Sequence, residues 1–184
     1  MAKDRRVSRT QKAMKTALLQ LMEKKSVNTI SVTELCELAD LNRSTFYDYY
    51  HDIYELLHVV HLDLFEAMNV YVKASQQAAK QQDHDSQQAF IAAVIEYMKS
   101  NDHLFQTLWK RSLEYDFEQQ LFQYFSSQLI IQQKDPLSNT TQRYEFLYHC
   151  AGSFAILRQW ILDDCPLSSL QLAQIIMNSI QIHH

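Results

Sequence analysis

Apolar residues recur every three or four positions along almost the whole chain, which is the spacing of amphipathic helices. Such stretches predict helices over residues 10–25, 32–39, 43–50, 52–79, 85–99, 101–110, 113–133, 141–162 and 168–181. The first stretch places its apolar side chains on one stripe, formed by Ala13, Met14, Ala17, Leu18, Leu21 and Met22. No segment shows the alternation of a β-strand. The pattern predicts an all-α protein of about nine helices.

Polar residues mark the second and third predicted helices. Ser31 and Glu34 have the spacing of a capping box, in which the serine hydroxyl accepts from the glutamate amide and the glutamate side chain reaches back. Between the two helices, Asp40 stands where the turn favours a left-handed residue. Asn42 is placed to cap the third helix, because its side chain can accept from a free amide there.

The glycine content excludes several classes of enzyme. The 184 residues include a single glycine, Gly152, and two prolines. A P-loop, a dinucleotide-binding turn and a nucleophile elbow each require more glycines than this chain has. No nucleophile–base pair is evident either. We therefore expect no enzyme activity and no cofactor.

Cysteine usage and hydropathy indicate the cellular compartment in which the protein is expected. The three cysteines, Cys36, Cys150 and Cys165, are an odd number without a CxxC pair, which favours reduced thiols. No apolar run reaches the roughly 18 residues of a membrane span, and the polar start lacks the apolar region of a signal peptide. We expect a cytoplasmic protein without membrane contact.

His58 and His61 lie three residues apart, but His51 precedes their helix, so no metal site is predicted.

Charge is distributed unevenly. The net charge is −4, yet residues 1–25 hold eight Lys or Arg against two Asp or Glu, a local charge of +6, and residues 61–184 hold eight against thirteen, a local charge of −5. A basic end can contact phosphates while the acidic remainder avoids non-specific surfaces. The charge alone is equally compatible with a solvated N-terminus. A nucleic-acid partner is therefore predicted only if a DNA-binding motif accompanies this charge.

Such a motif lies between the predicted second helix and the start of the fourth. Two short helices joined by a short turn form a helix-turn-helix when the second can enter a major groove. Residues 30–50, with Thr-Phe-Tyr-x-Tyr-Tyr at 45–50 followed by Asp-Ile-Tyr-Glu-Leu-Leu at 52–57, resemble the DNA-binding domain of TetR/AcrR-type bacterial transcriptional regulators. The match covers residues 8–60. Asp40 replaces the glycine usual in that family, which requires a positive φ at Asp40.

The resemblance places the third helix against base edges. Arg43 would then bind a guanine, Ser44 either base of a pair, and the methyl group of Thr45 a thymine. Tyr47 and Tyr49 are assigned mainly to phosphates. A solvated Arg43 and a packed surface Tyr47 are the plain alternatives, and Phe46 and Tyr50 are expected in the core.

Further phosphate contacts are expected from two other segments. Ser31 and Thr33 lie at a helix N-terminus, which favours anions. Arg5, Arg6 and Arg9 are expected on the flanking backbone or in a narrow minor groove. The partner implied is double-stranded DNA with a palindromic operator, because a two-fold dimer reads two half-sites.

The larger C-terminal part carries no comparable motif. In the family, its middle helices enclose a ligand cavity, and candidate liners with polar tips are Tyr97, His103, Trp109 and Tyr115. A mostly apolar pocket with few polar groups suits a hydrophobic or aromatic effector. Aromatic residues at helical spacing are also typical of an ordinary core.

The last two helices are the expected dimer interface by analogy. Gly152 lies within a predicted helix, where it costs about 1 kcal/mol relative to alanine. This cost favours close approach of another helix, either from a second subunit or from the last helix of the same chain. The expected apolar residues of the interface are Phe154, Ile161, Ile176 and Ile180. An intramolecular core is the alternative.

Together these features predict two domains, a helix-turn-helix domain over residues 1–52 and an effector-binding and dimerisation domain over residues 53–184. The predicted function is that of a homodimeric repressor released by a small molecule. The alternative is a constitutive DNA-binding dimer with no effector, whose C-terminal domain serves dimerisation or a protein partner.

Overall fold

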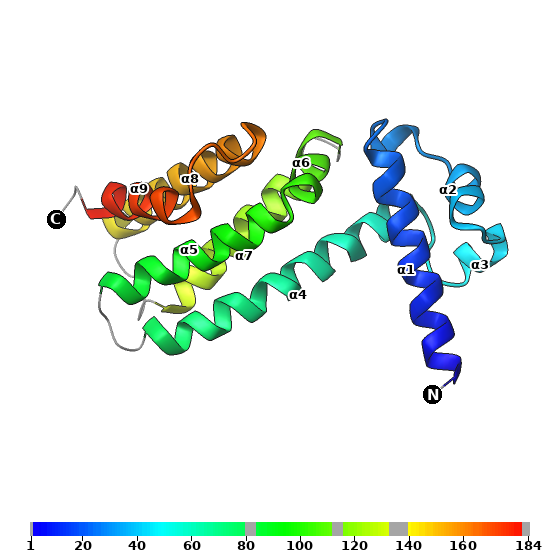
Figure 1. Ribbon diagram of the computed structural model, residues 1–184, viewed down its shortest axis with the longest axis horizontal. Helices are drawn as coiled ribbons and strands as arrows, with labels where there is room; N and C mark the ends of the chain where they lie inside the picture. The colour runs from blue at the N-terminus through cyan, green and yellow to red at the C-terminus, as the bar shows by residue number, and fades with distance from the viewer. Residues whose placement is uncertain (1, 80–83, 112–115, 133–139, 182–184) are drawn as a thin grey trace. The chain divides into compact units, whose positions relative to one another are not determined.

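The described part of the computed structural model is helical throughout, which confirms the predicted all-α class. It comprises residues 2–79, 84–111, 116–132 and 140–181, and it contains no strand. In chain order the elements are α1 (Ala2–Met22), the 3-10 turn η1 (Val27–Thr29), α2 (Val32–Ala39), α3 (Arg43–Tyr47), α4 (Ile53–Ala79), α5 (His84–Ser100), α6 (Asp102–Arg111), α7 (Asp116–Gln132), α8 (Thr140–Leu162) and α9 (Ser169–Gln181) (Figure 1).

Several helix bounds differ from the predicted ones, and two of these differences have a clear local cause. α1 begins at Ala2 instead of residue 10, because its first turns are helical without an apolar stripe that would reveal them. α3 ends at Tyr47 instead of Tyr50, since the amides of Tyr49 and Tyr50 both turn back to the Phe46 carbonyl. In the part of the chain that the structure describes, no helix is long and apolar enough to cross a bilayer.

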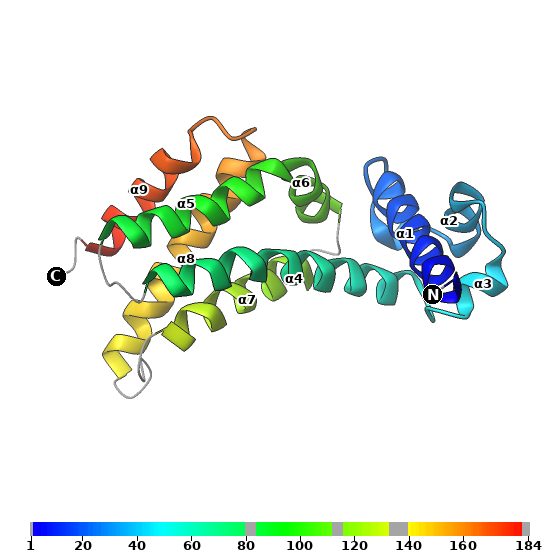
Figure 2. The ribbon, with the colours of Figure 1, turned by 60° about the horizontal axis from the view of Figure 1, so that its bottom comes forward.

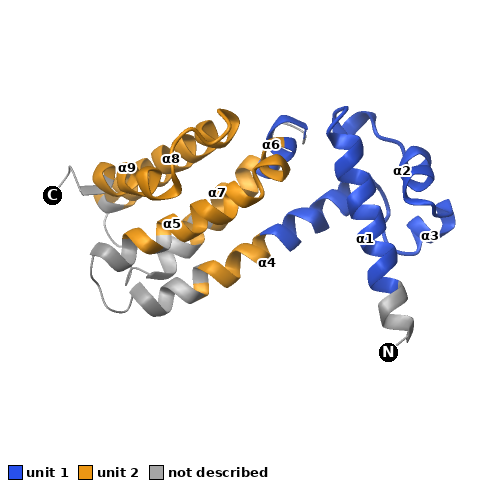
Figure 3. Ribbon diagram, viewed as in Figure 1, with its two compact units in different colours: residues 1–64, 107–117 blue, residues 65–106, 118–184 orange. Residues whose placement is uncertain are grey.

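The chain divides into two compact units. Unit 1 comprises residues 1–64 and 107–117, and unit 2 comprises residues 65–106 and 118–184 (Figure 3). This division follows packing, and it assigns the first three turns of α4 to unit 1. The functional boundary expected after residue 52 stays a prediction.

Unit 1 is built around the packing of α1 on α2, with α3 following α2. The apolar stripe predicted for the first helix supplies Met14, Leu18 and Met22, whose side chains are fully buried. Leu35 from α2 and Phe46 from α3 are buried with them. Burial of each such side chain is worth about 1.5–3 kcal/mol, so this core fixes the position of both short helices.

Unit 2 is built around the packing of α5 on α9, which lie side by side in Figure 2. Its buried side chains come from all of its helices and include Ile95, Met98, Phe105, Leu121, Phe154, Ile161, Leu172 and Ile176. Polar contacts join α5 to α9: Gln88 Nε2 donates to Gln174 Oε1 at 2.7 Å, and the hydroxyl of Ser169 donates to the Glu96 carboxylate. The last helix is therefore an integral part of this unit.

Candidate nucleic-acid interface

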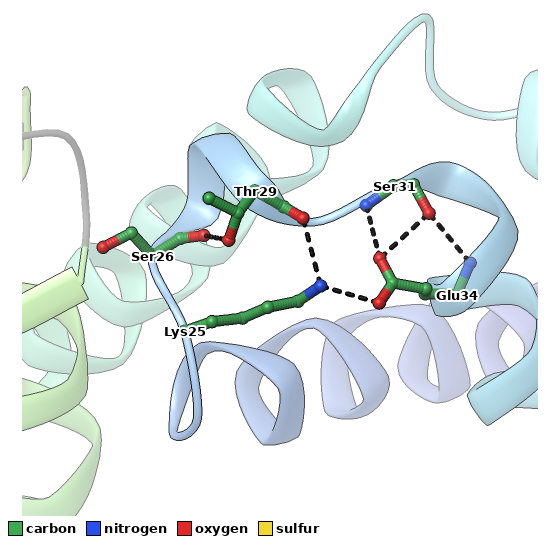
Figure 4. Close-up of polar contacts among 5 residues, drawn as sticks. All are labelled: Lys25, Ser26, Thr29, Ser31 and Glu34. Atoms are coloured by element: carbon green, nitrogen blue, oxygen red, sulfur yellow. Dashed lines mark hydrogen bonds and ion pairs between the residues drawn. The ribbon is translucent and has the colours of Figure 1, made fainter.

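The capping box predicted at the start of α2 is present. Ser31 Oγ accepts from the Glu34 amide at 3.2 Å, and Glu34 Oε2 accepts from the Ser31 amide at 3.1 Å (Figure 4). Each side chain thus satisfies one of the amides that a helix N-terminus leaves without a partner. The box fixes the start of α2, and it leaves Ser31 and Thr33 exposed at that end of the helix.

A lysine joins this capping box to the end of α1. Lys25 Nζ donates to Glu34 Oε1 at 2.7 Å and to the Thr29 carbonyl at 3.0 Å (Figure 4). Together with the Ser31 hydrogen bonds, the hydrogen bond from Lys25 lowers the pKa of Glu34 to about 2. The Lys25–Glu34 pair therefore connects the end of α1, the turn η1 and the start of α2.

The turn between α2 and α3 has the conformation predicted from Asp40. Its φ of 54° and ψ of 50° lie in the left-handed region. The Leu41 amide reaches back to the Cys36 carbonyl at 2.9 Å, as in a Schellman-type helix end. Asp40 thus ends α2 in the conformation that glycine usually adopts and directs the chain into α3.

One face of α3 is buried and the other is exposed. Phe46 is fully buried and Tyr50, just beyond the helix, is 4% exposed, with ring centroids 5.8 Å apart. Both expected core positions are thereby confirmed. Arg43, Ser44 and Tyr47 are exposed on the helix.

The remaining residues expected near α3 are half-buried or exposed. Thr45 and Tyr49 are half-buried. Asp48, which directly follows α3, is exposed. Asn42 precedes α3 in an extended conformation and is also exposed, but its side chain makes no capping hydrogen bond. The capping role predicted for that side chain is therefore wrong.

Positive charge in unit 1 comes mainly from α1. Arg43 is the single Lys or Arg within residues 26–60, and it makes no ion pair with another described residue. On α1, Arg9 and Lys12 are exposed, whereas Lys15 Nζ lies 2.5 Å from Asp63 Oδ2 of α4. The side chains of Arg5 and Arg6 lie outside the described residues. A phosphate-binding surface in this unit would therefore depend on α1.

The residues expected at an effector pocket lie in different surroundings. Tyr97 of unit 2 is half-buried, with its ring centroid 4.9 Å from that of Tyr71. Trp109 of unit 1 is half-buried, with its ring centroid 5.7 Å from that of Phe117. His103 is exposed, and Tyr115 lies outside the described residues.

Sequence reasoning missed a polar contact inside unit 2. Tyr124 Oη donates to Asn69 Oδ1 at 2.9 Å, and its ring stacks on Phe65 with centroids 5.1 Å apart. Burial raises the pKa of Tyr124 to about 12. Burial also raises the pKa of Tyr97, and the charge of Tyr71 adds a smaller increase. The only sequence signal for this contact is the spacing of Phe65 and Asn69 by one helical turn.

The expected dimer residues divide between core and surface. Phe154, Ile161 and Ile176 are buried within the protomer, which corresponds to the intramolecular alternative, and the side chain of Ile180 lies outside the described part of the structure. Gly152 is exposed, and a methyl group added to it would meet no atom of the protomer within 4 Å. The structure therefore gives no reason within one chain for this glycine. Around it, α8 exposes further side chains, namely Tyr144, Leu147, Tyr148, Ala151 and Ala155.

Comparisons with known proteins agree with this fold. Residues 85–182 match a family model described as "Transcriptional regulator C-terminal region" (TetR_C_8). Among solved structures, a TetR transcriptional regulator from Streptococcus agalactiae 2603V has a TM-score of 0.73 at 18% identity, with 98% of both chains covered. The dihydroxyacetone kinase operon activator DhaS has a TM-score of 0.64 at 21% identity, with 95% of both chains covered.

A third solved structure, the fatty acid degradation regulator FadR from Bacillus halodurans, has a TM-score of 0.65 at 11% identity, with 95% of this chain and 97% of that chain covered. At these identities the structural likenesses show the fold. A comparison with curated proteins gives no significant match.

Proposed function

The chain belongs to the TetR family of transcriptional regulators, whose members bind DNA and act as dimers, and from this premise we propose that it is a homodimeric repressor with α3 as its recognition helix. The observation that carries this proposal is the two-sided character of α3. Phe46 anchors the helix to the core of unit 1, while Arg43, Ser44 and Tyr47 remain exposed and able to contact a major groove.

Base readout is assigned to the first turn of α3. Arg43 binds the O6 and N7 atoms of a guanine, and Ser44 and Thr45 contact neighbouring bases, with the Thr45 methyl group against a thymine. That Arg43 is exposed and makes no ion pair with a described residue supports this assignment, since no competing contact has to be broken.

Phosphate contacts are assigned to residues around this helix. Tyr47 and Tyr49 contribute hydroxyl groups, and Ser31 and Thr33 lie exposed at the start of α2. Arg5, Arg6 and Arg9 of α1 supply charge. Such contacts position the protein on the duplex without reading its sequence.

The proposed dimer contact lies on the exposed face of α8. Its residues are Tyr144, Leu147, Tyr148, Ala151, Gly152 and Ala155. Small residues let two helices approach closely, and the open space beside Gly152 in the protomer supports its use against a second copy of α8. Phe154, Ile161 and Ile176 contribute indirectly, because they hold α8 and α9 in place.

The proposed effector is a hydrophobic or aromatic small molecule bound within unit 2, in the cytoplasm. Half-buried Tyr97 and the Tyr124–Asn69 pair provide a few polar groups among aromatic rings, as in many ligand sites. An effector that prefers one spacing of the two recognition helices lowers the affinity for DNA that fits the other spacing.

In vitro selection from random duplex DNA with the full-length protein tests the proposal. We expect inverted repeats whose half-site centres lie about one helical turn apart, with affinity that falls steeply with salt. Selection of no sequence would contradict the proposed DNA-binding function.

A thermal-shift screen with hydrophobic ligands tests the proposed effector. The absence of any stabilising compound would favour the alternative, a DNA-binding dimer without an effector. Because a structurally similar protein is described as an operon activator, a promoter–reporter assay must establish the sign of regulation.

A further inference from the structure

The side chain of Asn42 has no role in the fold. It directly precedes α3, and its carbonyl accepts from the Phe46 amide at 3.3 Å. Its side chain is exposed and makes no hydrogen bond with any described residue. Its backbone is extended, with a ψ of 147°.

The polar residues that precede other α-helices are used differently wherever the structure describes them, although Ser26, which precedes the 3-10 turn η1, also makes no capping hydrogen bond. Ser31, Asp52 and Ser168 each accept a hydrogen bond from the amide three residues further on, at 3.2, 2.8 and 3.3 Å. Asn101, which precedes α6, donates its amide to the Tyr97 carbonyl at 2.8 Å. Asn42 thus differs from four comparable positions, and it is the one next to the exposed first turn of α3.

From this contrast we infer that Asn42 is a specificity-determining residue that reads an adenine beside the base contacted by Arg43. The inference rests on the proposed DNA-binding function. A side-chain amide offers a donor and an acceptor together, and adenine presents the matching N7 acceptor and N6 donor in the major groove. The amide of Asn42 is available for both hydrogen bonds, because no capping interaction occupies it.

The residues beside Asn42 favour a base over a phosphate. Within residues 37–48, Glu37, Asp40 and Asp48 are exposed acidic side chains and Arg43 is the only basic one. Phosphate attraction at this end of α3 is therefore weak, and a neutral amide gains little from the backbone. Hydrogen bonds to base edges do not require positive charge.

The test compares the full-length protein with Asn42→Ser on the DNA that each selects. Serine retains the ability to cap a helix but has no amide, so a loss of base preference cannot be attributed to capping. The wild-type half-site is expected to contain an adenine whose replacement by guanine weakens binding roughly tenfold. For Asn42→Ser this ratio should fall to about one, with an unchanged melting temperature.

A substitution in the DNA identifies the atom that is read. With 7-deazaadenine at that position, which lacks the N7 acceptor, binding by the wild type should weaken several-fold and binding by Asn42→Ser should not change. The inference is overturned if Asn42→Ser retains the adenine preference, or if it weakens binding to all sequences equally, which would indicate a backbone contact.

Arg43→Ala separates the adenine contact of Asn42 from the proposed DNA-binding function. If it alters the selected half-site while Asn42→Ser does not, only the adenine contact is wrong, and if the wild type selects no sequence, both are.

Discussion

Lys25 Nζ lies 2.7 Å from Glu34 Oε1, and this ion pair joins the end of α1 to the capping box that starts α2. Both side chains are partly exposed, so the contribution of the pair to stability depends on its geometry more than on burial. Its value for the proposed function is positional, because α1 carries basic residues and α2 precedes the turn that leads into α3, the proposed recognition helix.

Acid should remove this contribution. A carboxyl group with a lower pKa in the folded than in the unfolded chain stabilises the fold above its unfolded pKa, near 4.5, and loses that effect as the pH falls toward its folded pKa of about 2. Glu34→Gln should therefore be less stable than the wild type at pH 7, and the difference should shrink between pH 4.5 and 2. Urea unfolding across that range measures it. Glu37→Gln, on the same helix, is the control, and an equal pH dependence in both variants would contradict the role of Glu34.

The left-handed turn at Asp40 predicts opposite effects for two substitutions. Asp40→Gly should stabilise unit 1 by up to about 1 kcal/mol, because glycine adopts positive φ without steric cost. Asp40→Ala should destabilise it by about 1 kcal/mol, because alanine lacks the short polar side chain that tolerates this region. Thermal unfolding followed by circular dichroism distinguishes them. Equal melting temperatures for both variants would mean that the φ of 54° carries no strain.

The two faces of α3 predict two different losses. Phe46→Ala removes a fully buried ring and should destabilise unit 1 by about 3–5 kcal/mol. Tyr47→Phe should leave the melting temperature unchanged, since Tyr47 is 51% exposed. The same substitution should weaken binding to all DNA sequences equally, by about tenfold. Calorimetry and titration with specific and scrambled duplexes separate stability from binding. A loss for Tyr47→Phe that is confined to one sequence would instead assign its hydroxyl to a base.

The open position at Gly152 allows a test of the dimer contact. Gly152→Leu should raise the dimer dissociation constant by about tenfold or more, because overpacking of a close helix contact costs about 1–3 kcal/mol. The protomer should still fold, as no atom lies within 4 Å of an added Cβ. Analytical ultracentrifugation measures the dissociation constant. Ala93→Leu, at an exposed alanine of α5, is the matched control, and equal dissociation constants for the two variants would place the interface elsewhere.

The sequence predicted the helix-turn-helix well because its signals are local. The Ser31–Glu34 box, the turn at Asp40 and the burial of Phe46 all follow from short-range spacing, and the structure contains all three. Residues 2–9 lack an apolar stripe, so the true start of α1 had no such signal.

Other features depend on contacts that spacing cannot identify. Phe154 and Ile161 form an apolar stripe that either an internal core or a partner could cover, and the structure places them in the core. Asparagine is a favoured capping residue, so only the three-dimensional structure reveals that the side chain of Asn42 does not cap α3. The Tyr124–Asn69 hydrogen bond joins residues 55 positions apart, beyond the reach of any local pattern.

The most direct test of the central claim is the affinity of Arg43→Ala for the selected operator and for a scrambled duplex, measured by fluorescence anisotropy at fixed salt. If α3 reads bases through Arg43, the specificity ratio should fall by a factor corresponding to about 1–3 kcal/mol, with binding to the scrambled duplex reduced much less. Lys99→Ala, which removes an exposed charge from α5 in unit 2, should leave the ratio unchanged. An unchanged ratio for Arg43→Ala, or an equal loss on both duplexes, would contradict the assignment of α3 as the recognition helix.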